Sequence, residues 1–140
     1  MSEVDCAQLL VKTQHLDQWQ QRREKIAHYW IERLKSSAIR CLIDETNVQT
    51  HCFHKFVIDI SGRDRVARQM QIRGVETRVH YELPLTEMDA YQQYPGPGML
   101  SKAAMLSRGV LSLPCYPELT DLEVEYIIDQ LLDSYAEVHS

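Results

Sequence analysis

The chain has 140 residues, a formal net charge of -5 and 44% hydrophobic residues, which is the size and composition of one globular domain with its own core. The acidic balance argues against a nucleic-acid-binding protein, because phosphate binding needs a concentrated basic surface. No apolar run approaches the roughly 20 residues of a membrane helix, and no membrane association is expected.

The spacing of the cysteines does not indicate a disulfide framework. There is no Cys-x-x-Cys, and no basic-then-apolar leader opens the chain. The pattern therefore predicts reduced thiols in a cytoplasmic protein. The four cysteines are Cys6, Cys41, Cys52 and Cys115.

The N-terminal quarter predicts one long amphipathic helix over residues 3–35. Ser2 and Asp5 have the spacing of a capping box, and Ser36 and Ser37 end the pattern. The charged segment 21–25 alternates in sign, which indicates a solvated helix face. Apolar residues recur close to helical spacing at Leu9, Leu16, Trp19, Ile26, Ala27, Trp30, Ile31 and Leu34.

Two strands are expected next. Residues 39–43 and 52–60 are rich in β-branched and aromatic residues and are separated by a polar loop. Because they follow one another closely, they are predicted to pair as antiparallel neighbours.

A short helix and a third strand follow. Ser61 is placed to cap the helix, Val66 and Met70 would face the core, and Gly74 would end the helix in the left-handed conformation. Residues 75–81 then alternate as in a strand.

The segment after Pro84 mixes turns and a helix. Residues 86–92 are predicted to form one or two helical turns, and the prolines and glycines of residues 94–98 indicate a loop. A short helix is expected over residues 99–108, ending at Gly109.

The last helix has the clearest start signal. Thr120 and Glu123 form a second capping box, with Leu119 and Val124 placed as a hydrophobic staple. The expected fold class is α+β, with a long N-terminal helix and a small, mainly antiparallel sheet covered by helices, as a single domain over residues 1–140. The predicted core stripe of the last helix is Tyr126, Ile127, Leu131 and Tyr135.

The sequence gives little support for a metal site or for a nucleophilic cysteine. On a strand, His51 and His54 would point to opposite faces, leaving Cys52 and His54 on one side. Even with His80 from a neighbouring strand, a core-edge histidine beside a small buried thiol is the favoured interpretation, and no metal site is predicted. A nucleophilic Cys52 or Cys115 is not indicated by its surroundings either.

Arg78, His80 and Tyr81 form the one dense polar group on a predicted strand beside a proline-bounded loop. Such positions often contact ligands. Taken by themselves, these three residues are better explained as a solvated strand end.

The order of several motifs resembles the C-terminal small domain of the DegT/DnrJ/StrS family of pyridoxal-phosphate-dependent sugar-nucleotide aminotransferases. The resemblance covers the whole chain, beginning with the long helix. The most characteristic motifs are Gly74-Val-Glu-Thr-Arg-Val-His-Tyr81, Leu111-Ser-Leu-Pro114 and Tyr116-Pro-Glu-Leu-Thr-Asp121.

The resemblance implies a transamination in which a lysine-bound pyridoxal phosphate moves an amino group onto a nucleotide-linked keto sugar, although some relatives use the cofactor for dehydration. The family's Schiff-base lysine belongs to a large domain that this chain does not match. No catalytic and no cofactor-binding residue is therefore assigned here. The resemblance implies that His80 and Tyr81, with Arg78, line the sugar-nucleotide side of the active site. The lysines present, none in the family's cofactor motif, are Lys12, Lys25, Lys35, Lys55 and Lys102.

Two functional hypotheses remain open. The chain is either a small-domain fragment of an aminotransferase, inactive alone, or a stand-alone non-catalytic module that binds a sugar nucleotide or a protein. In the first case its partner is the large pyridoxal-phosphate-binding domain, missing or separately encoded. An uncovered apolar surface would also favour self-association. The sequence names neither the sugar nor the amino donor.

Overall fold

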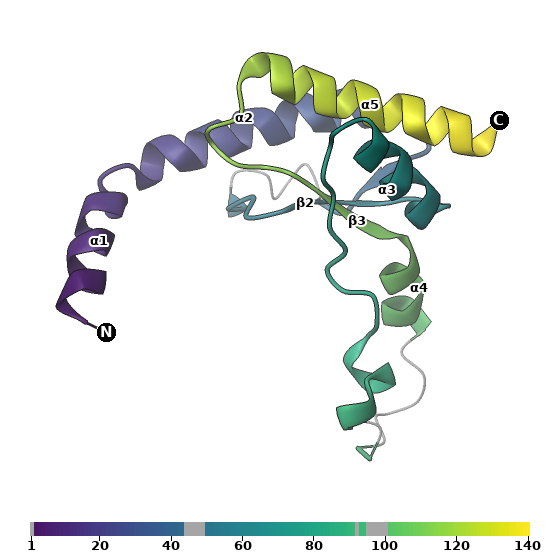
Figure 1. Ribbon diagram of the computed structural model, residues 1–140, viewed down its shortest axis with the longest axis horizontal. Helices are drawn as coiled ribbons and strands as arrows, with labels where there is room; N and C mark the ends of the chain where they lie inside the picture. Colours follow the sequence, from purple (N-terminus) through teal and green to yellow (C-terminus); the bar gives the residue numbers. More distant parts are fainter. Residues whose placement is uncertain (1, 44–49, 92, 95–100) are drawn as a thin grey trace.

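The computed structural model describes residues 2–43, 50–91, 93–94 and 101–140. It consists of helices and three short strands in the described residues, and the predicted α+β class is confirmed (Figure 1). The helices are α1 (Glu3–Thr13), α2 (Leu16–Leu34), α3 (Arg63–Ile72), α4 (Ser101–Gly109) and α5 (Asp121–His139), with the short 3-10 helices η2 (Leu85–Glu87) and η3 (Asp89–Tyr91). The strands are β1 (Arg40–Cys41), β2 (Phe56–Asp59) and β3 (Val110–Leu113).

The three strands form one antiparallel sheet in the order β1-β2-β3, as predicted for the first pair. Phe56 lies opposite Leu113, and Ile58 lies opposite Leu111. The predicted strands 39–43 and 52–60 are too long, since only residues 40–41 and 56–59 pair.

The predicted strand 75–81 is wrong. Arg78 alone bridges to Ser112, through backbone hydrogen bonds of 3.1 and 2.7 Å. At the start of the segment the N–H of Val75 donates instead to the carbonyl of Met70 at the end of α3. This hydrogen bond to the end of α3 therefore takes the place of strand pairing at the start of the segment.

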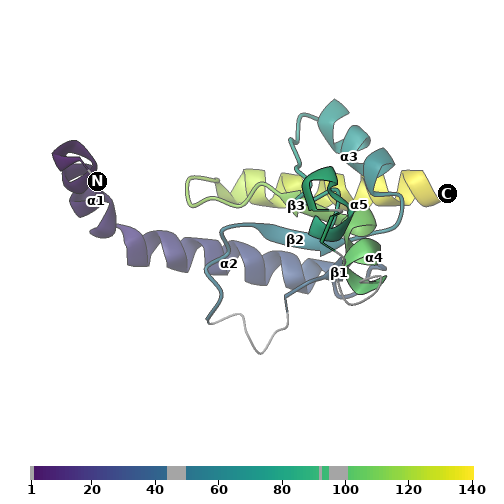
Figure 2. The ribbon, with the colours of Figure 1, turned by 90° about the horizontal axis from the view of Figure 1, so that it is seen from below.

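The core lies between the sheet and the helices α2 and α5, which run side by side (Figures 1 and 2). The rings of Trp30 and Phe56 meet edge to face with centroids 5.1 Å apart. Trp30, Phe56, Ile58 and Leu111 are completely or almost completely buried. Alternate residues of β2 and β3 thus supply the apolar face that both helices cover.

The single long N-terminal helix is also wrong, because the chain turns at Gln14 and His15 between α1 and α2. Both residues donate their N–H groups to carbonyls three residues earlier, at 3.3 and 3.1 Å, which is a tight non-α turn. The Ser2 capping box is confirmed. However, α1 has no buried residue and projects from the body of the molecule (Figure 1), so that Leu9 is 46% exposed rather than part of the core.

The start of α3 differs from the prediction, whereas its end agrees. Gly62, with φ at +65°, precedes the helix, and Ser61 does not cap it but bonds to Nε2 of His139 at 2.8 Å. Val66 and Met70 are buried as predicted. Gly74 follows the helix with φ at +78°, the left-handed conformation that glycine adopts at low cost.

The turns predicted over residues 86–92 are present as η2 and η3, and α4 runs to Gly109. Most of the predicted loop 94–98 and the first two residues of the predicted helix 99–108 lie outside the described residues. Among the described residues, no helix combines the length and apolarity needed to cross a membrane.

The capping box of α5 is confirmed, and Leu119 and Val124 are both buried as the staple requires. The predicted core position of Tyr126 is wrong. Its ring is 48% exposed and its hydroxyl donates to the carbonyl of Arg73 at 2.9 Å, which draws the side chain toward α3. The buried positions of α5 are Val124, Ile127, Ile128, Leu131 and Ser134.

The charged segment 21–25 is not simply solvated. Arg22 donates to the carbonyl of Leu119 at 2.6 Å and pairs with Asp121 at 2.8 Å, so it ties α2 to the start of α5.

Candidate functional site

His80 and Tyr81 line an open hollow of about 600 Å³. The hollow lies between the segment that follows Arg78 and helix α4. The position of His80 and Tyr81 follows from Arg78, whose bridge to Ser112 fixes the chain at the edge of β3 two residues earlier. The lining is mainly apolar. The remaining residues are Leu83, Pro84, Leu85, Met88, Ala103, Leu106, Ser107 and Val110.

The His80 imidazole is positioned by a contact with strand β3. Its Nδ1 lies 2.9 Å from Oγ of Ser112, a buried residue of β3. Desolvation lowers the pKa of His80, and electrostatic interactions with Lys55, His54 and Arg78 lower it further. At neutral pH the site therefore presents an uncharged imidazole.

Tyr81 lies beside this imidazole, with ring centroids 5.8 Å apart and the rings nearly perpendicular at 85°. Its side chain is 68% exposed. An exposed ring with a polar tip can pack against a ligand and hydrogen-bond to it at the same time.

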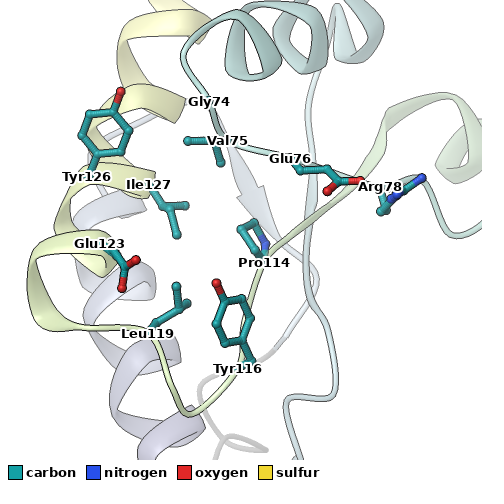
Figure 3. A pocket seen from close by; sticks show the side chains of 10 residues that line it. All are labelled: Gly74, Val75, Glu76, Arg78, Pro114, Tyr116, Leu119, Glu123, Tyr126 and Ile127. Carbon is teal, nitrogen blue, oxygen red and sulfur yellow. Dashed lines mark hydrogen bonds and ion pairs between the residues drawn. The ribbon is translucent and has the colours of Figure 1, made fainter.

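Arg78 does not join His80 and Tyr81. Its guanidinium forms an ion pair with Glu76 and lies at the rim of a second hollow, of about 470 Å³ (Figure 3). The structure thus brings two of the three predicted residues together. It places the third in neighbouring surroundings, from which its charge still acts on His80.

The second hollow has an apolar floor formed by Val75, Leu119 and Ile127, and the rings of Tyr116 and Tyr126 stand on its walls (Figure 3). Tyr116 and Tyr126 were not predicted as surface-lining residues. Their contribution depends on the contact between the loop before α5 and the segment after α3, which no local pattern reveals.

Among the residues that the structure describes, no three His, Cys, Asp or Glu side chains are grouped to hold a metal ion. The expected buried thiol is wrong, because Cys52 is exposed. Residues 51–54 precede the strand, and Nδ1 of His51 accepts the N–H of Phe53 at 2.9 Å.

Ser112 is the residue that sequence reasoning missed. It is the polar position in the otherwise apolar strand Val110–Leu113, and all four residues of that strand are buried. A hydroxyl in such a place requires a partner, and that requirement could have drawn attention to it.

Comparison with protein families gives a match over residues 1–132 to the model described as the DegT/DnrJ/EryC1/StrS aminotransferase family. The "Pleiotropic regulatory protein" of Geobacillus stearothermophilus is 31% identical over 96% of this chain and 37% of its own length. The dTDP-3-amino-3,6-dideoxy-alpha-D-galactopyranose transaminase of Aneurinibacillus thermoaerophilus is 29% identical over 92% of this chain and 35% of its own length.

Solved structures give the same picture. DesV of S. venezuelae, crystallised with a ketimine intermediate, superposes with a TM-score of 0.81 at 28% identity, over 91% of this chain and 34% of that protein. An aminotransferase from Brucella abortus superposes with a TM-score of 0.82 at 26% identity, over 91% of this chain and 34% of that protein. The chain spans 34% to 37% of the length of the curated relatives it matches.

Proposed function

Because the chain belongs to the DegT/DnrJ/EryC1/StrS aminotransferase family, we propose that it acts as the C-terminal small domain of a sugar-nucleotide aminotransferase. In this role it forms the substrate-side wall of the active site and is not catalytic alone. The substrate class, a nucleotide-linked keto sugar, is taken from relatives such as the dTDP-amino-sugar transaminases. Reduced thiols are consistent with a cytoplasmic location.

The observation that carries this proposal is the hollow beside His80 and Tyr81. It combines an apolar lining with an imidazole fixed at 2.9 Å from Ser112 and an exposed phenol. Few, well-oriented polar groups in an apolar concavity are typical of small-molecule sites. In this arrangement a sugar ring packs on Tyr81 while its hydroxyls form hydrogen bonds with His80.

Pyridoxal phosphate does not fit this hollow. Among the described residues that line it there is no lysine amine for a Schiff base, no carboxylate for the pyridine nitrogen and no guanidinium for the phosphate. Lys55, the lysine whose charge acts on His80, does not line the hollow. We therefore place the cofactor chemistry in a separate large domain and assign no step of it to this chain.

Helix α1 supplies the surface for that large domain in our proposal. None of its residues is buried, and the side chains of Val4, Leu10 and Val11 are 65%, 70% and 60% exposed. Exposed apolar side chains grouped on a helix favour association. Sedimentation of the chain with and without the large domain of a relative tests this, with self-association as the competing result.

Binding is tested by titrating the ¹⁵N-labelled chain with a dTDP-linked amino sugar. The resonances of His80 and Tyr81 should move, and His80→Gln and Tyr81→Phe should each weaken binding about fivefold, the loss of one hydrogen bond. The matched changes His28→Gln and Tyr29→Phe lie on α2, away from the hollow. A titration that stays flat both for the chain alone and for its complex with the large domain of a relative would reject the substrate-side role.

Catalytic independence is tested with pyridoxal phosphate itself. After incubation and borohydride reduction, mass spectrometry should find no adduct concentrated at a single lysine. Stoichiometric modification of one defined lysine would contradict the non-catalytic role.

The alternative function is a stand-alone module that binds a sugar nucleotide or a protein without catalysis. The second hollow, with Tyr116 and Tyr126 on its walls, favours it because the chain builds that surface from its own segments. Full affinity for the sugar nucleotide without any large domain would support this alternative. Affinity that appears only in the complex would support the aminotransferase role.

A further inference from the structure

We propose that Ser112 is a positioning residue that holds His80 as the tautomer with its proton on Nε2, so that His80 donates a hydrogen bond to an acceptor oxygen of the sugar nucleotide. This inference rests on the proposed function for its ligand. The arrangement of the two side chains, however, can be tested without any ligand.

The first step concerns the Ser112 hydroxyl. Ser112 is only 5% exposed, and within the described part of the chain its hydroxyl has a single hydrogen-bond partner, Nδ1 of His80 at 2.9 Å. Its backbone N–H and carbonyl are already used in the bridge to Arg78. A buried hydroxyl hydrogen without an acceptor is costly, about 1–3 kcal/mol, so the hydroxyl must donate to Nδ1.

The second step concerns the imidazole. A neutral imidazole has one N–H and one lone pair. Because Nδ1 accepts from Ser112, the proton of neutral His80 is on Nε2. No hydrogen bond from another described residue reaches Nε2, and His80 lines the hollow. The nitrogen left for a ligand is therefore a donor.

The third step concerns charge. Lys55 and His54 precede β2, and Arg78 lies two residues before His80; all three disfavour a second proton on the ring, in addition to desolvation. Protonation would also require the Ser112 hydroxyl to become an acceptor, leaving its own hydrogen without a partner. Both effects keep His80 neutral, and the hydrogen bond with Ser112 selects the tautomer.

The consequence is selectivity for the ligand group. A neutral N–H donor in an apolar hollow favours a hydroxyl, carbonyl or phosphoryl oxygen and offers nothing to a cationic amine. The ligand oxygen next to His80 is thus an acceptor. A sugar nucleotide carries all three kinds of oxygen.

The test is a long-range ¹H–¹⁵N NMR spectrum of the full chain at neutral pH, with His80 assigned from the signal lost in His80→Gln. The expected spectrum shows a protonated Nε2 and an unprotonated Nδ1. Ser112→Ala should give a mixture of tautomers, whereas Ser112→Thr, which keeps the hydroxyl, should restore the single tautomer. Ser134→Ala removes another buried serine hydroxyl and should leave the His80 signals unchanged.

A protonated Nδ1 in the wild type, or a single unchanged tautomer in Ser112→Ala, would overturn the positioning role. Titration with a dTDP-linked amino sugar separates this failure from that of the proposed function. Ser112→Ala should weaken binding roughly fivefold and Ser112→Thr by less than about twofold. The expected tautomer with a titration that stays flat for both the chain alone and its complex with the large domain of a relative would reject the ligand and the proposed function. The wrong tautomer with intact binding would reject the positioning role alone.

Discussion

The indole nitrogen of Trp30 donates a hydrogen bond of 2.9 Å to the main-chain carbonyl of Val124. This bond joins α2 to the first turn of α5 at residues 94 positions apart, and the Trp30 side chain is fully buried. The two helices that cover the sheet are therefore locked together by a polar contact inside an apolar core.

Trp30→Phe should lower the free energy of unfolding by about 2–3 kcal/mol, because it removes this hydrogen bond and leaves a cavity where the larger ring lay. Urea unfolding measures the change as a shift of the midpoint at constant slope. Trp19→Phe, at a half-exposed position of the same helix, is the matched control. Equal losses for the two variants would show that the contact with Val124 adds nothing.

Gly109→Ala should lower the stability by about 1–3 kcal/mol through overpacking. A Cβ at this position would lie 2.0 Å from Oδ1 of Asp59, so the carboxylate would have to leave its place beside Arg40. Thermal unfolding measures the loss. In the double variant Gly109→Ala with Asp59→Ala, the loss should be smaller than the sum of the single changes; strict additivity would contradict the clash.

Ser134→Ala should raise the stability by about 1 kcal/mol. The Ser134 hydroxyl is completely buried in α5 and has no partner among the described residues, and alanine removes this cost and favours the helix. Ser107→Ala is the contrasting variant, since that hydroxyl donates to the carbonyl of Ala104 at 2.9 Å. Chemical denaturation should show a gain for the first change and none for the second.

The cysteines should differ in reactivity toward iodoacetamide at pH 8. Burial raises the pKa of Cys41 and of Cys115 to about 11, which leaves each with roughly a hundredfold less thiolate than an ordinary exposed cysteine. Cys52 is exposed and should react first. Timed alkylation followed by peptide mass spectrometry gives the order, and early labelling of Cys115 would show that the core opens around it.

His80 should make the stability depend on pH on the acid side. Desolvation, with Lys55, His54 and Arg78, lowers its pKa in the folded state, so the unfolded chain binds the proton more readily. The contribution is present above the ordinary histidine pKa of about 6.5 and is lost as the pH falls through the lower folded-state value. Free energies of unfolding from pH 7.5 down to about 5 should fall less steeply in His80→Gln than in the wild type. His28→Gln, on the exposed side of α2, is the matched histidine control.

Patterns within one element predicted the fold well. Both capping boxes are formed, Gly74 is left-handed, and the apolar positions Val66 and Met70 are buried. Each of these depends on residues three or four positions apart, or on one residue's own backbone preference. The local sequence therefore contains all the information needed to predict these features.

Two patterns that needed a distant partner failed. Residues 75–81 alternate like a strand, yet only Arg78 pairs with β3, because the end of α3 holds Val75. Helical spacing continues through His15, but in the described part of the chain α1 has no buried residue whose packing would select a straight continuation. Periodicity indicates which face could be buried, and only the tertiary partner decides whether it is.

The candidate site was predicted in the same partial way. His80 and Tyr81 line one hollow, whereas Arg78 lines the other, and their predicted contact with a sugar nucleotide stays a prediction. Ser112 could not be connected to His80 from sequence, because the two residues are 32 positions apart and meet through a single bridge.

The turn at Gln14 and His15 divides the molecule into units that need not melt together. An 11-residue helix with no buried side chain lies below the length at which an isolated helix is stable in water, about 12–15 residues. Its helicity therefore depends on what it touches, whereas α2 is fixed by the core. A spectroscopic label on Cys6 would consequently report contacts of α1 while leaving the cooperative unfolding of the rest undisturbed.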